Sequence, residues 1–384
     1  MNLSTAMPPS RRRIVLVKGT EGLGNRILAL LSAILYARLA GRTVVVDWRD
    51  GFYADPGTNA FPLLFRSDVA VALKDETPSG SVAPWMWERR LCLTATEMEK
   101  VLAPHGIRGC PFVGGLYSFD PRDLGHAADV LVMWSLISVV GQLRRHFAGR
   151  WSEWRGLGDD DILARLLHEH LQLHPTIVAQ VDAVRQAWPD RPRIGVHVRH
   201  TDRKTNLRRL RRRLDALVAR LPHAVIFLAT DAAGVEEDFR GRYGDVLTVP
   251  KWFPASGPLH GRDSSCPDRL AMARASLVEM RLLTECDHLV VNGDSSFSQI
   301  AKLWWRGERR RVIDVGAWAW LPPSVRDRTW RGRDAVRWAP WLWRARRHIR
   351  RQQAGKSCCR PAGSGEPPAA RAEVNRAAAN EVAE

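Results

Sequence analysis

Residues 194–204 read IGVHVRHTDRK, a short apolar run that delivers several charged side chains into one loop. Val196 and Val198 alternate with His197 and Arg199, as expected at a strand end whose successive side chains face opposite ways. In open α/β sheets ligands bind beyond the carboxyl ends of the strands, where a guanidinium can hold phosphate bidentately without a metal. The stretch therefore predicts an anion-binding edge, although an ordinary ion pair in a solvated loop would explain the same residues taken alone.

The chain around this stretch alternates between strand and helix patterns. Predicted strands cover residues 194–198, 224–230, 246–249 and 288–293, and predicted helices cover 207–221, 233–244, 269–286 and 295–305. Such alternation is typical of a parallel sheet covered by helices. The leucines at 207, 210, 214, 217 and 221 recur at helical spacing, so the arginines between them are expected on a solvated outer face.

A similar pattern opens the chain. Residues 14–18 and 43–48 are apolar strand candidates, and the segment between them contains the glycine loop GTEGLGNR and a helix pattern that Gly41 would cap. The two α/β patterns predict a two-domain, doubly wound protein. We expect a flexible start at 1–12, an α/β domain at 13–185, a second Rossmann-like domain at 190–345, and a disordered basic and Ala-rich tail at 350–384.

Two motifs have competing interpretations. GLGNRI, with Asp47 at the next strand end, imitates a dinucleotide fingerprint, but Ile27 replaces the third glycine and weakens an NAD hypothesis. A tight β-to-α turn alone would also explain Asn25 and Arg26. The acidic triplet at 159–161 resembles a metal-binding Asp-x-Asp, but the first turn of a helix explains it better, so no metal site is predicted.

Composition limits the classes of partner. The 384 residues carry 58 Lys and Arg against 41 Asp and Glu, an excess that favours anionic partners. No recognition module accompanies the basic clusters, so nucleic-acid binding is not predicted, while peripheral membrane contact through the basic C-terminal region stays open. The six cysteines show no framework spacing, and neither a secretion signal nor a long uninterrupted apolar run occurs. We therefore expect a cytoplasmic protein without a transmembrane segment.

Further polar residues follow the other predicted strands of the second half. FLATD ends in Thr230 and Asp231, and VVNGDSSFSQ supplies Ser295 and Ser296 at a strand-to-helix turn. Glu279 lies on the helix before that turn. Hydroxyl groups and free backbone N–H groups at the start of a helix suit phosphate oxygens, so a nucleotide-diphosphate site is predicted.

The order of these segments resembles a known enzyme superfamily. IGVHVRHTD, IFLATD and LVEMRLLTECDHLVVNGDSSFSQIA resemble the three conserved regions of the alpha-1,6-fucosyltransferase and protein O-fucosyltransferase superfamily. GLGNR and DWRDGFYADPGTNAFPLLF are similar, more narrowly, to the nodulation fucosyltransferases of rhizobia. The resemblance covers roughly residues 13–320 and leaves the C-terminal tail uncovered.

The resemblance implies a GT-B-type fold with two Rossmann-like halves and an inverting, metal-independent transfer of L-fucose from GDP-fucose. The acceptor would be a hydroxyl of a chitin-like oligosaccharide containing N-acetylglucosamine. Arg199 would hold the diphosphate, and Asp202 is the first candidate for the base. The implied donor-binding residues are Gly22, Gly24, Asn25, Arg26, His197, Arg199, His200, Asp202, Asp231, Glu279, Ser295 and Ser296, and the implied acceptor-binding residues are Trp48, Phe52, Tyr53, Asp55 and Asn59.

One departure from the pattern keeps alternatives open. Some relatives carry another acidic residue several positions after the motif arginine, whereas this chain continues KTNLRRL. A catalytically inactive sugar- or polyanion-binding protein of the same fold therefore remains a second hypothesis, as does a transferase with another nucleotide sugar or acceptor. Tryptophans at 304, 305, 318 and 320 could stack on a carbohydrate, but core packing is the commoner role of such residues.

Overall fold

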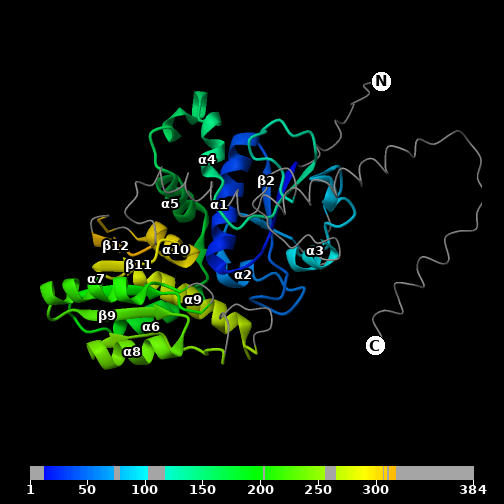
Figure 1. Ribbon diagram of the computed structural model, residues 1–384. Helices are drawn as coiled ribbons and strands as arrows, with labels where there is room; N and C mark the ends of the chain where they lie inside the picture. Colours follow the sequence, from blue (N-terminus) through cyan, green and yellow to red (C-terminus); the bar gives the residue numbers. More distant parts are fainter. Residues whose placement is uncertain are drawn as a thin grey trace, which may run out of the picture. The chain divides into compact units, whose positions relative to one another are not determined.

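The computed structural model describes residues 13–72, 78–102, 117–201, 204–255, 265–305, 307–308 and 311–316. All of them belong to one compact unit, which contains two five-stranded parallel sheets with helices packed around them (Figure 1). The predicted flexible start at 1–12 and tail at 350–384 lie outside the described residues, as does Asp202.

The first sheet has the order β4-β2-β1-β6-β5. Its centre is β1 (Ile14–Lys18), which is buried along its whole length between β2 (Thr43–Asp47) and β6 (Val130–Met133). Helix α1 (Leu23–Ala40) joins β1 to β2 and ends at Gly41, whose left-handed φ of 64° lets its N–H bond the carbonyl of Ala37. The predicted β-α-β unit is confirmed, whereas β6 was not predicted.

Short elements complete the first half. The outer strands β4 (Ala70–Val71) and β5 (Val82–Ala83) have two residues each, and β3 (Phe65–Arg66) pairs with β7 (Gln172–Leu173) in a separate antiparallel ladder. The helices are α2 (Phe61–Leu64), η1 (Trp85–Trp87), α3 (Ala95–Leu102), α4 (Val140–Leu143), η3 (Arg144–His146), η4 (Gly149–Trp154), α5 (Asp159–His170) and α6 (Pro175–Gln186).

The acidic triplet occupies the first turn of α5, as predicted. The Asp161 carboxylate accepts the backbone N–H of Gly158 at 3.2 Å, and Asp159 pairs with Arg144. These carboxylates therefore start a helix and complement its dipole.

The second sheet has the order β10-β9-β8-β11-β12, which is 3-2-1-4-5 in chain order. Its strands are β8 (Arg193–Val198), β9 (Val225–Thr230), β10 (Val246–Leu247), β11 (His288–Val291) and β12 (Val312–Asp314). The strand order reverses between β8 and β11, which makes this position the topological switch point where doubly wound sheets bind ligands.

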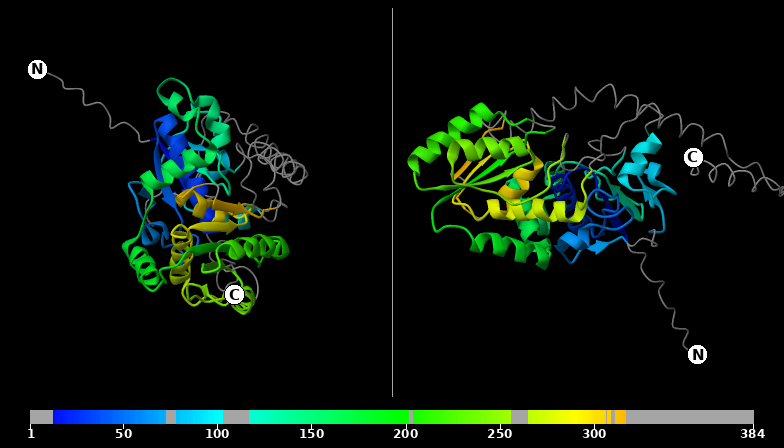
Figure 2. Two further views of the ribbon diagram at one scale, coloured as in Figure 1. Left: turned by 90° about the vertical axis from the view of Figure 1, so that its left-hand side faces the viewer. Right: turned by 90° about the horizontal axis from the view of Figure 1, so that it is seen from below.

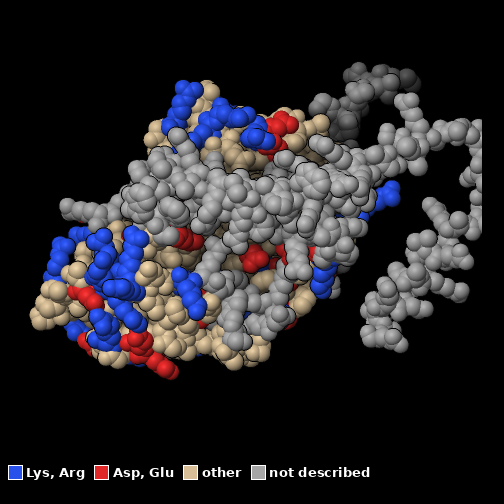
Figure 3. Space-filling model, viewed as in Figure 1, with Lys and Arg blue, Asp and Glu red and all other residues tan. Residues whose placement is uncertain are grey.

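Helices cover both faces of the second sheet (Figure 2). Helices α7 (Leu207–Arg220) and α8 (Ala233–Tyr243) pack on one face, with Leu210, Leu214 and Phe239 in the same core cluster as Val196. On the other face lie α6 and α9 (Arg269–Leu283), whose buried residues share a core cluster with Phe227 of β9. The predicted outer face of α7 is confirmed, and Figure 3 shows its basic side chains gathered on the surface.

The two halves share a core through α1 and α10 (Ser296–Trp304). A Cβ added at Gly24 would lie 2.5 Å from the carbonyl carbon of Ser296, so only glycine permits this close approach of the two helix starts. By length and apolar composition α1 could cross a membrane, but 83% of it is buried inside the protein, as in the core helix of a water-soluble fold. The two sheets match the predicted halves of the chain, while the exact domain boundaries stay predictions.

Candidate active site

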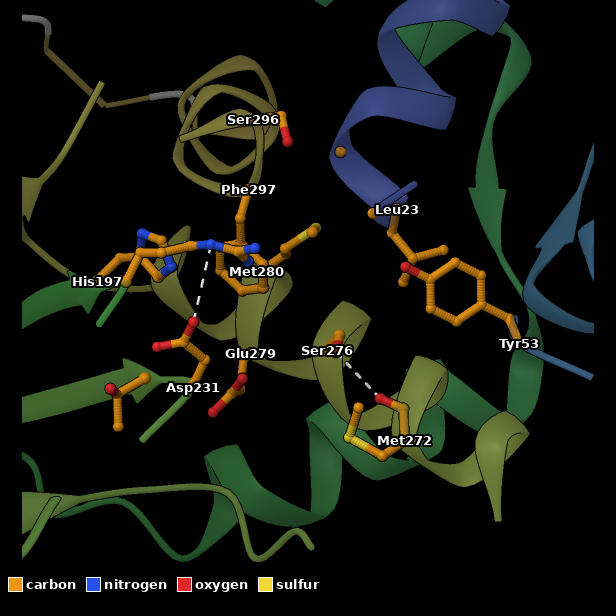
Figure 4. Close-up of a pocket in the computed structure, with 14 residues that line it drawn as sticks. Leu23, Tyr53, His197, Asp231, Met272, Ser276, Glu279, Met280, Ser296 and Phe297 are labelled. Carbon is orange, nitrogen blue, oxygen red and sulfur yellow. Dashed lines mark hydrogen bonds and ion pairs between the residues drawn. The ribbon is translucent and has the colours of Figure 1, made fainter. Parts of the chain in front are cut away.

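A pocket opens at the switch point of the second sheet, opposite the start of α1 (Figure 4). Strands β8 and β9, helices α9 and α10, and the glycine turn after β1 all contribute to its wall. The lining residues are Gly22, Leu23, Gly24, Tyr53, His197, Arg199, Thr230, Asp231, Met272, Ser276, Glu279, Met280, Ser296 and Phe297.

The loop after β8 is fixed at both ends. The Arg199 N–H donates to the Thr205 hydroxyl at 3.2 Å, and the Thr205 N–H donates back to the Arg199 carbonyl at 2.8 Å. The Asp231 carboxylate, at the end of β9, accepts the His200 N–H and the Thr201 hydroxyl, both at 2.6 Å. Its Oδ2 lies 3.7 Å from Nε of Arg199. Asp231 therefore braces the loop that carries the pocket's guanidinium.

His197 is buried and stacks on Phe297 of α10, with ring centroids 4.4 Å apart. Its Nδ1 shares a hydrogen bond of 2.6 Å with the Ser298 hydroxyl. Burial, together with the nearby positive charges of Arg199 and Lys251, lowers the pKa of His197 to about 3. The imidazole is therefore neutral near pH 7 and offers the pocket a hydrogen-bonding group without charge.

Two helices begin at the pocket. The first turns of α1 and α10 contribute Gly22, Gly24 and Ser296 to its wall. The first N–H groups of a helix lack partners within it, and the dipole places partial positive charge there. Two such starts and the Arg199 side chain make this part of the pocket suitable for an anion.

A buried ion pair forms another part of the wall. Glu279 of α9 pairs with Nζ of Lys251, which follows β10. Burial raises the pKa of Glu279, and the contact with Lys251 partly offsets this rise. Sequence analysis missed Lys251, because a single lysine in the turn segment VPKWFP carries no recognisable pattern.

The predicted donor residues divide into two groups. Seven of them line the pocket: Gly22, Gly24, His197, Arg199, Asp231, Glu279 and Ser296. Four others are described but are not among the lining residues: Asn25, Arg26, His200 and Ser295. His200 joins the Asp231 brace through its backbone, and Ser295 caps α10.

Arg26 lies outside the pocket lining and contacts the loop after β2. Its guanidinium makes two hydrogen bonds to Asp50, at 2.6 and 3.0 Å, and its Nε donates to the Glu21 carbonyl at 2.9 Å. The side chain is buried, and its Cζ lies 4.9 Å from the Tyr53 ring centroid. Arg26 therefore holds the loop after β2, and its contact with the donor stays a prediction.

The predicted acceptor residues occupy different environments. Tyr53 lines the pocket, and burial raises its pKa to about 12, so its hydroxyl stays protonated. Phe52 lies beside it, with ring centroids 6.2 Å apart. Trp48 is only 1% exposed and packs edge-on against Phe61, so it belongs to the core. The side-chain amide of Asn59 bonds backbone groups around β2, and Asp55 is exposed in a turn outside the pocket lining.

The dinucleotide hypothesis requires Asp47 to bind a ribose. Asp47 is buried and pairs with Lys18 at 2.6 Å and with Arg49 at 2.8 Å. Lys18 in turn donates to the carbonyls of Leu91 and Leu93. The carboxylate that would hold a ribose is thus already occupied. Within the described ranges, no group of three or more His, Cys, Asp or Glu side chains is arranged to hold a metal ion.

Comparison with known proteins gives the family. The family model described as Nodulation protein Z (NodZ) matches residues 11–89 and 153–317, which together make up more than half of the chain. The chain belongs to the NodZ family. Its sequence is 26% identical over 327 residues to nodulation protein Z of Bradyrhizobium diazoefficiens, covering 77% of this chain and 80% of that protein. It is 28% identical over 307 residues to the Azorhizobium caulinodans protein, covering 72% and 84%.

Solved NodZ structures share the fold. The crystal structure of fucosyltransferase NodZ from Bradyrhizobium aligns with a TM-score of 0.53 and 24% identity, over 76% of this chain and 93% of that one. NodZ alpha-1,6-fucosyltransferase soaked with GDP-fucose aligns with a TM-score of 0.51 and 23% identity, over 76% and 92%. The fold is therefore the GT-B type, and membership of the NodZ family makes this chain a glycosyltransferase.

Proposed function

We propose that this NodZ-family chain transfers L-fucose from GDP-fucose to a sugar hydroxyl, with inversion at the anomeric carbon and without a metal. One observation carries the proposal: Arg199 and the starts of α1 and α10 converge on a single pocket at the switch point of the second sheet. The relatives whose names specify fucosyl transfer and GDP-fucose support this choice of donor.

The diphosphate would lie beside Arg199 and the two helix starts. As the bond between fucose C1 and the phosphate oxygen breaks, negative charge grows on the β-phosphate. A fixed guanidinium stabilises that charge more in the transition state than in the ground state, which accelerates the reaction. Asp231 holds the loop that carries Arg199. His197 is neutral, so it can form a hydrogen bond in the pocket without adding a charge there.

The acceptor hydroxyl would attack C1 from the face opposite the leaving phosphate and lose its proton to a base. Asp231 is occupied by His200 and Thr201, and Glu279 is paired with Lys251. Asp202, in the motif loop but outside the described residues, therefore remains our candidate for the base. Tyr53, with Phe52 beside it, gives the pocket an aromatic ring from the first half of the chain, which suits the apolar face of a sugar ring.

We propose an oligosaccharide containing N-acetylglucosamine as the acceptor and the cytoplasm as the compartment. The free thiols of Cys92 and Cys286 support a reducing compartment. The test is incubation of the purified chain with GDP-fucose and chitin oligosaccharides in EDTA, with mass spectrometry of the sugars. Addition of one fucose by the wild-type protein, and addition that is about 10²- to 10³-fold slower by Arg199→Ala, is the expected result.

The transfer assay, combined with binding measurements at increasing salt, separates the polyanion-binding alternative. A protein held to anions by its basic surface would transfer no fucose, its binding would weaken steeply with salt, and Arg199→Ala would leave that binding intact. That combination of results would replace our proposal with the alternative.

A further inference from the structure

A buried arginine–aspartate pair contacts the wall of the pocket without belonging to its lining. Two hydrogen bonds join the Arg26 guanidinium to the Asp50 carboxylate, and the exposures of these side chains are 0% and 2%. Burying two charges carries a large desolvation cost, and well-packed apolar side chains of similar volume often stabilise a core at least as well. The pair is therefore better suited to fixing a local geometry than to adding stability.

Aromatic rings from the same loop as Asp50 surround the guanidinium. The Cζ atom of Arg26 lies 4.9, 5.3 and 5.6 Å from the ring centroids of Tyr53, Phe52 and Trp48, respectively. At such distances a cation is attracted to the electron-rich face of a ring. Because these rings and Asp50 all belong to the short segment 48–53, a single side chain of α1 contacts most of this segment.

The guanidinium also reaches the turn before α1. The Glu21 carbonyl accepts a hydrogen bond from Nε of Arg26 at 2.9 Å and another from the Tyr53 hydroxyl at 3.5 Å. The start of α1 is held by its own backbone, since the Asn25 and Arg26 N–H groups donate to the Gly22 carbonyl at 3.0 and 3.2 Å. Loss of the Arg26 side chain should therefore move the loop that carries Tyr53 and leave the helix start in place.

Tyr53 is the residue of this group that reaches the pocket. Figure 4 shows it beside Leu23, on the side of the pocket away from His197 and Asp231. An aromatic ring with one polar end suits a sugar, which presents an apolar ring face together with hydroxyl groups. The position of such a ring matters, because a displacement of about 1 Å in a substrate-positioning group can cost roughly 10²-fold in rate.

We infer that Arg26 and Asp50 are positioning residues for the acceptor, which hold the Tyr53 ring where a sugar packs against it. This inference rests on the proposed function, because it concerns the sugar that receives fucose. It separates two roles for Arg26. A positioning residue affects transfer to the acceptor and spares the binding of the nucleotide, whereas a residue that contacts the diphosphate affects nucleotide binding directly.

The test measures the donor and the acceptor separately on the full chain. Isothermal titration gives the affinity for GDP, and fucose transfer at saturating GDP-fucose gives kcat/KM for chitin oligosaccharides. Arg26→Lys keeps the charge and loses the two-pronged contact with Asp50. Arg38→Lys is the matched control, because Arg38 also lies on α1 and makes two hydrogen bonds to a carboxylate, that of Glu169, outside the pocket lining.

Arg26→Lys should lower kcat/KM for the oligosaccharide by about ten- to a hundredfold, as expected when a substrate-positioning group is displaced. Its affinity for GDP should stay close to that of the wild type, and Arg38→Lys should change neither quantity. In a Tyr53→Ala background, Arg26→Lys should cause little further loss, because its effect passes through the missing ring. A merely structural role would give the same loss with and without that ring.

A second variant keeps the inference open to refutation if Arg26→Lys fails to fold. Asp50→Asn keeps the shape of the carboxylate and removes its charge, so it should show the same separation of acceptor and donor effects. An unchanged kcat/KM for the acceptor, a fall in GDP affinity, or equal losses with and without the Tyr53 ring would overturn the inference and leave the proposed function intact. A wild-type protein that transfers no fucose would instead overturn the proposed function and this inference with it.

Discussion

At the scale of single residues, the pocket depends on one guanidinium that its neighbours hold in place. Replacing Arg199 with Ala should lower kcat by about 10²- to 10³-fold, the usual effect of removing one preorganised group that stabilises developing charge. Arg199→Lys should recover only part of the rate, because an ammonium cannot form the two-pronged contact of a guanidinium. Steady-state kinetics with GDP-fucose would measure both effects.

The matched control is Arg208→Ala on the exposed face of α7, which should leave kcat unchanged. A thermal melt of each variant would show that the fold is retained. Full turnover by Arg199→Ala would refute the role given to this residue.

His197 leads to a prediction about pH and stability. Its pKa is about 3 in the folded protein and near 6.5 when unfolded, so the unfolded chain binds more protons between these values. The stability that comes from this shifted pKa is fully present above pH 6.5, and it is lost progressively as the pH falls towards 3. Relative to His197→Phe, the wild-type protein should therefore lose roughly 2 kcal/mol of unfolding free energy between pH 7 and pH 5.

Urea denaturation of both proteins at the two pH values would measure this difference, since the other titrating groups are common to both. Equal losses in the two proteins would show that His197 is protonated in the folded state. That result would contradict the neutral imidazole placed in the pocket.

At the scale of elements, the approach of α1 to α10 sets the geometry of the pocket. A Cβ at position 24 would lie 2.6 Å from the carbonyl oxygen of Ser296 and 2.8 Å from the Phe297 nitrogen, and backbone atoms cannot move aside as a flexible side chain would. Gly24→Ala should destabilise the protein by about 1–3 kcal/mol. It should also weaken GDP binding, because both helix starts would shift.

Gly241→Ala is the control for this substitution. Gly241 lies within α8, and nothing lies within 4 Å of an added Cβ there. This variant should be up to about 1 kcal/mol more stable than the wild type, because alanine favours the helix. Denaturant titrations would compare the stabilities of the two variants and the wild type. Equal stability of Gly24→Ala and the wild type would contradict the tight contact between α1 and α10.

Strong periodicity made some elements predictable from sequence. The leucine spacing of α7 and the Gly41 cap of α1 act within their own segments, so their placement needs no tertiary information. Strand β6 has only four residues in a region of turns, and it is a strand because it pairs with β1. The two-residue strands β4 and β5 are likewise defined by their neighbours.

For the site residues too, sequence predicts local patterns but not tertiary contacts. Arg199 and Asp231 were predictable because each follows a recognisable strand, and parallel strands bring their ends together. Arg26 and Trp48 were predicted to bind ligands from the family resemblance. In the fold, the Arg26 guanidinium pairs with Asp50, and Trp48 is buried in the core. Lys251 was missed because its partner Glu279 lies 28 positions away, a pairing that only the fold reveals.

At the scale of the whole molecule, the two sheets are joined into one compact unit, and residues of both halves of the chain contribute to the pocket. Besides the shared core, Arg269 at the start of α9 donates to the Gly51 carbonyl at 2.5 Å. The loop that carries Tyr53 is thus tied to the helix that carries Glu279. Donor and acceptor groups can therefore be brought together from distant parts of the sequence.

We propose that this pocket binds GDP-fucose through Arg199 and backbone groups without a metal. The most direct measurement is isothermal titration of the full chain with GDP-fucose in EDTA and again in Mg²⁺. Our account predicts one site per chain with the same affinity in both buffers, and a large loss of affinity in Arg199→Ala. Binding that appears only with the divalent ion, or no binding in either buffer, would contradict it.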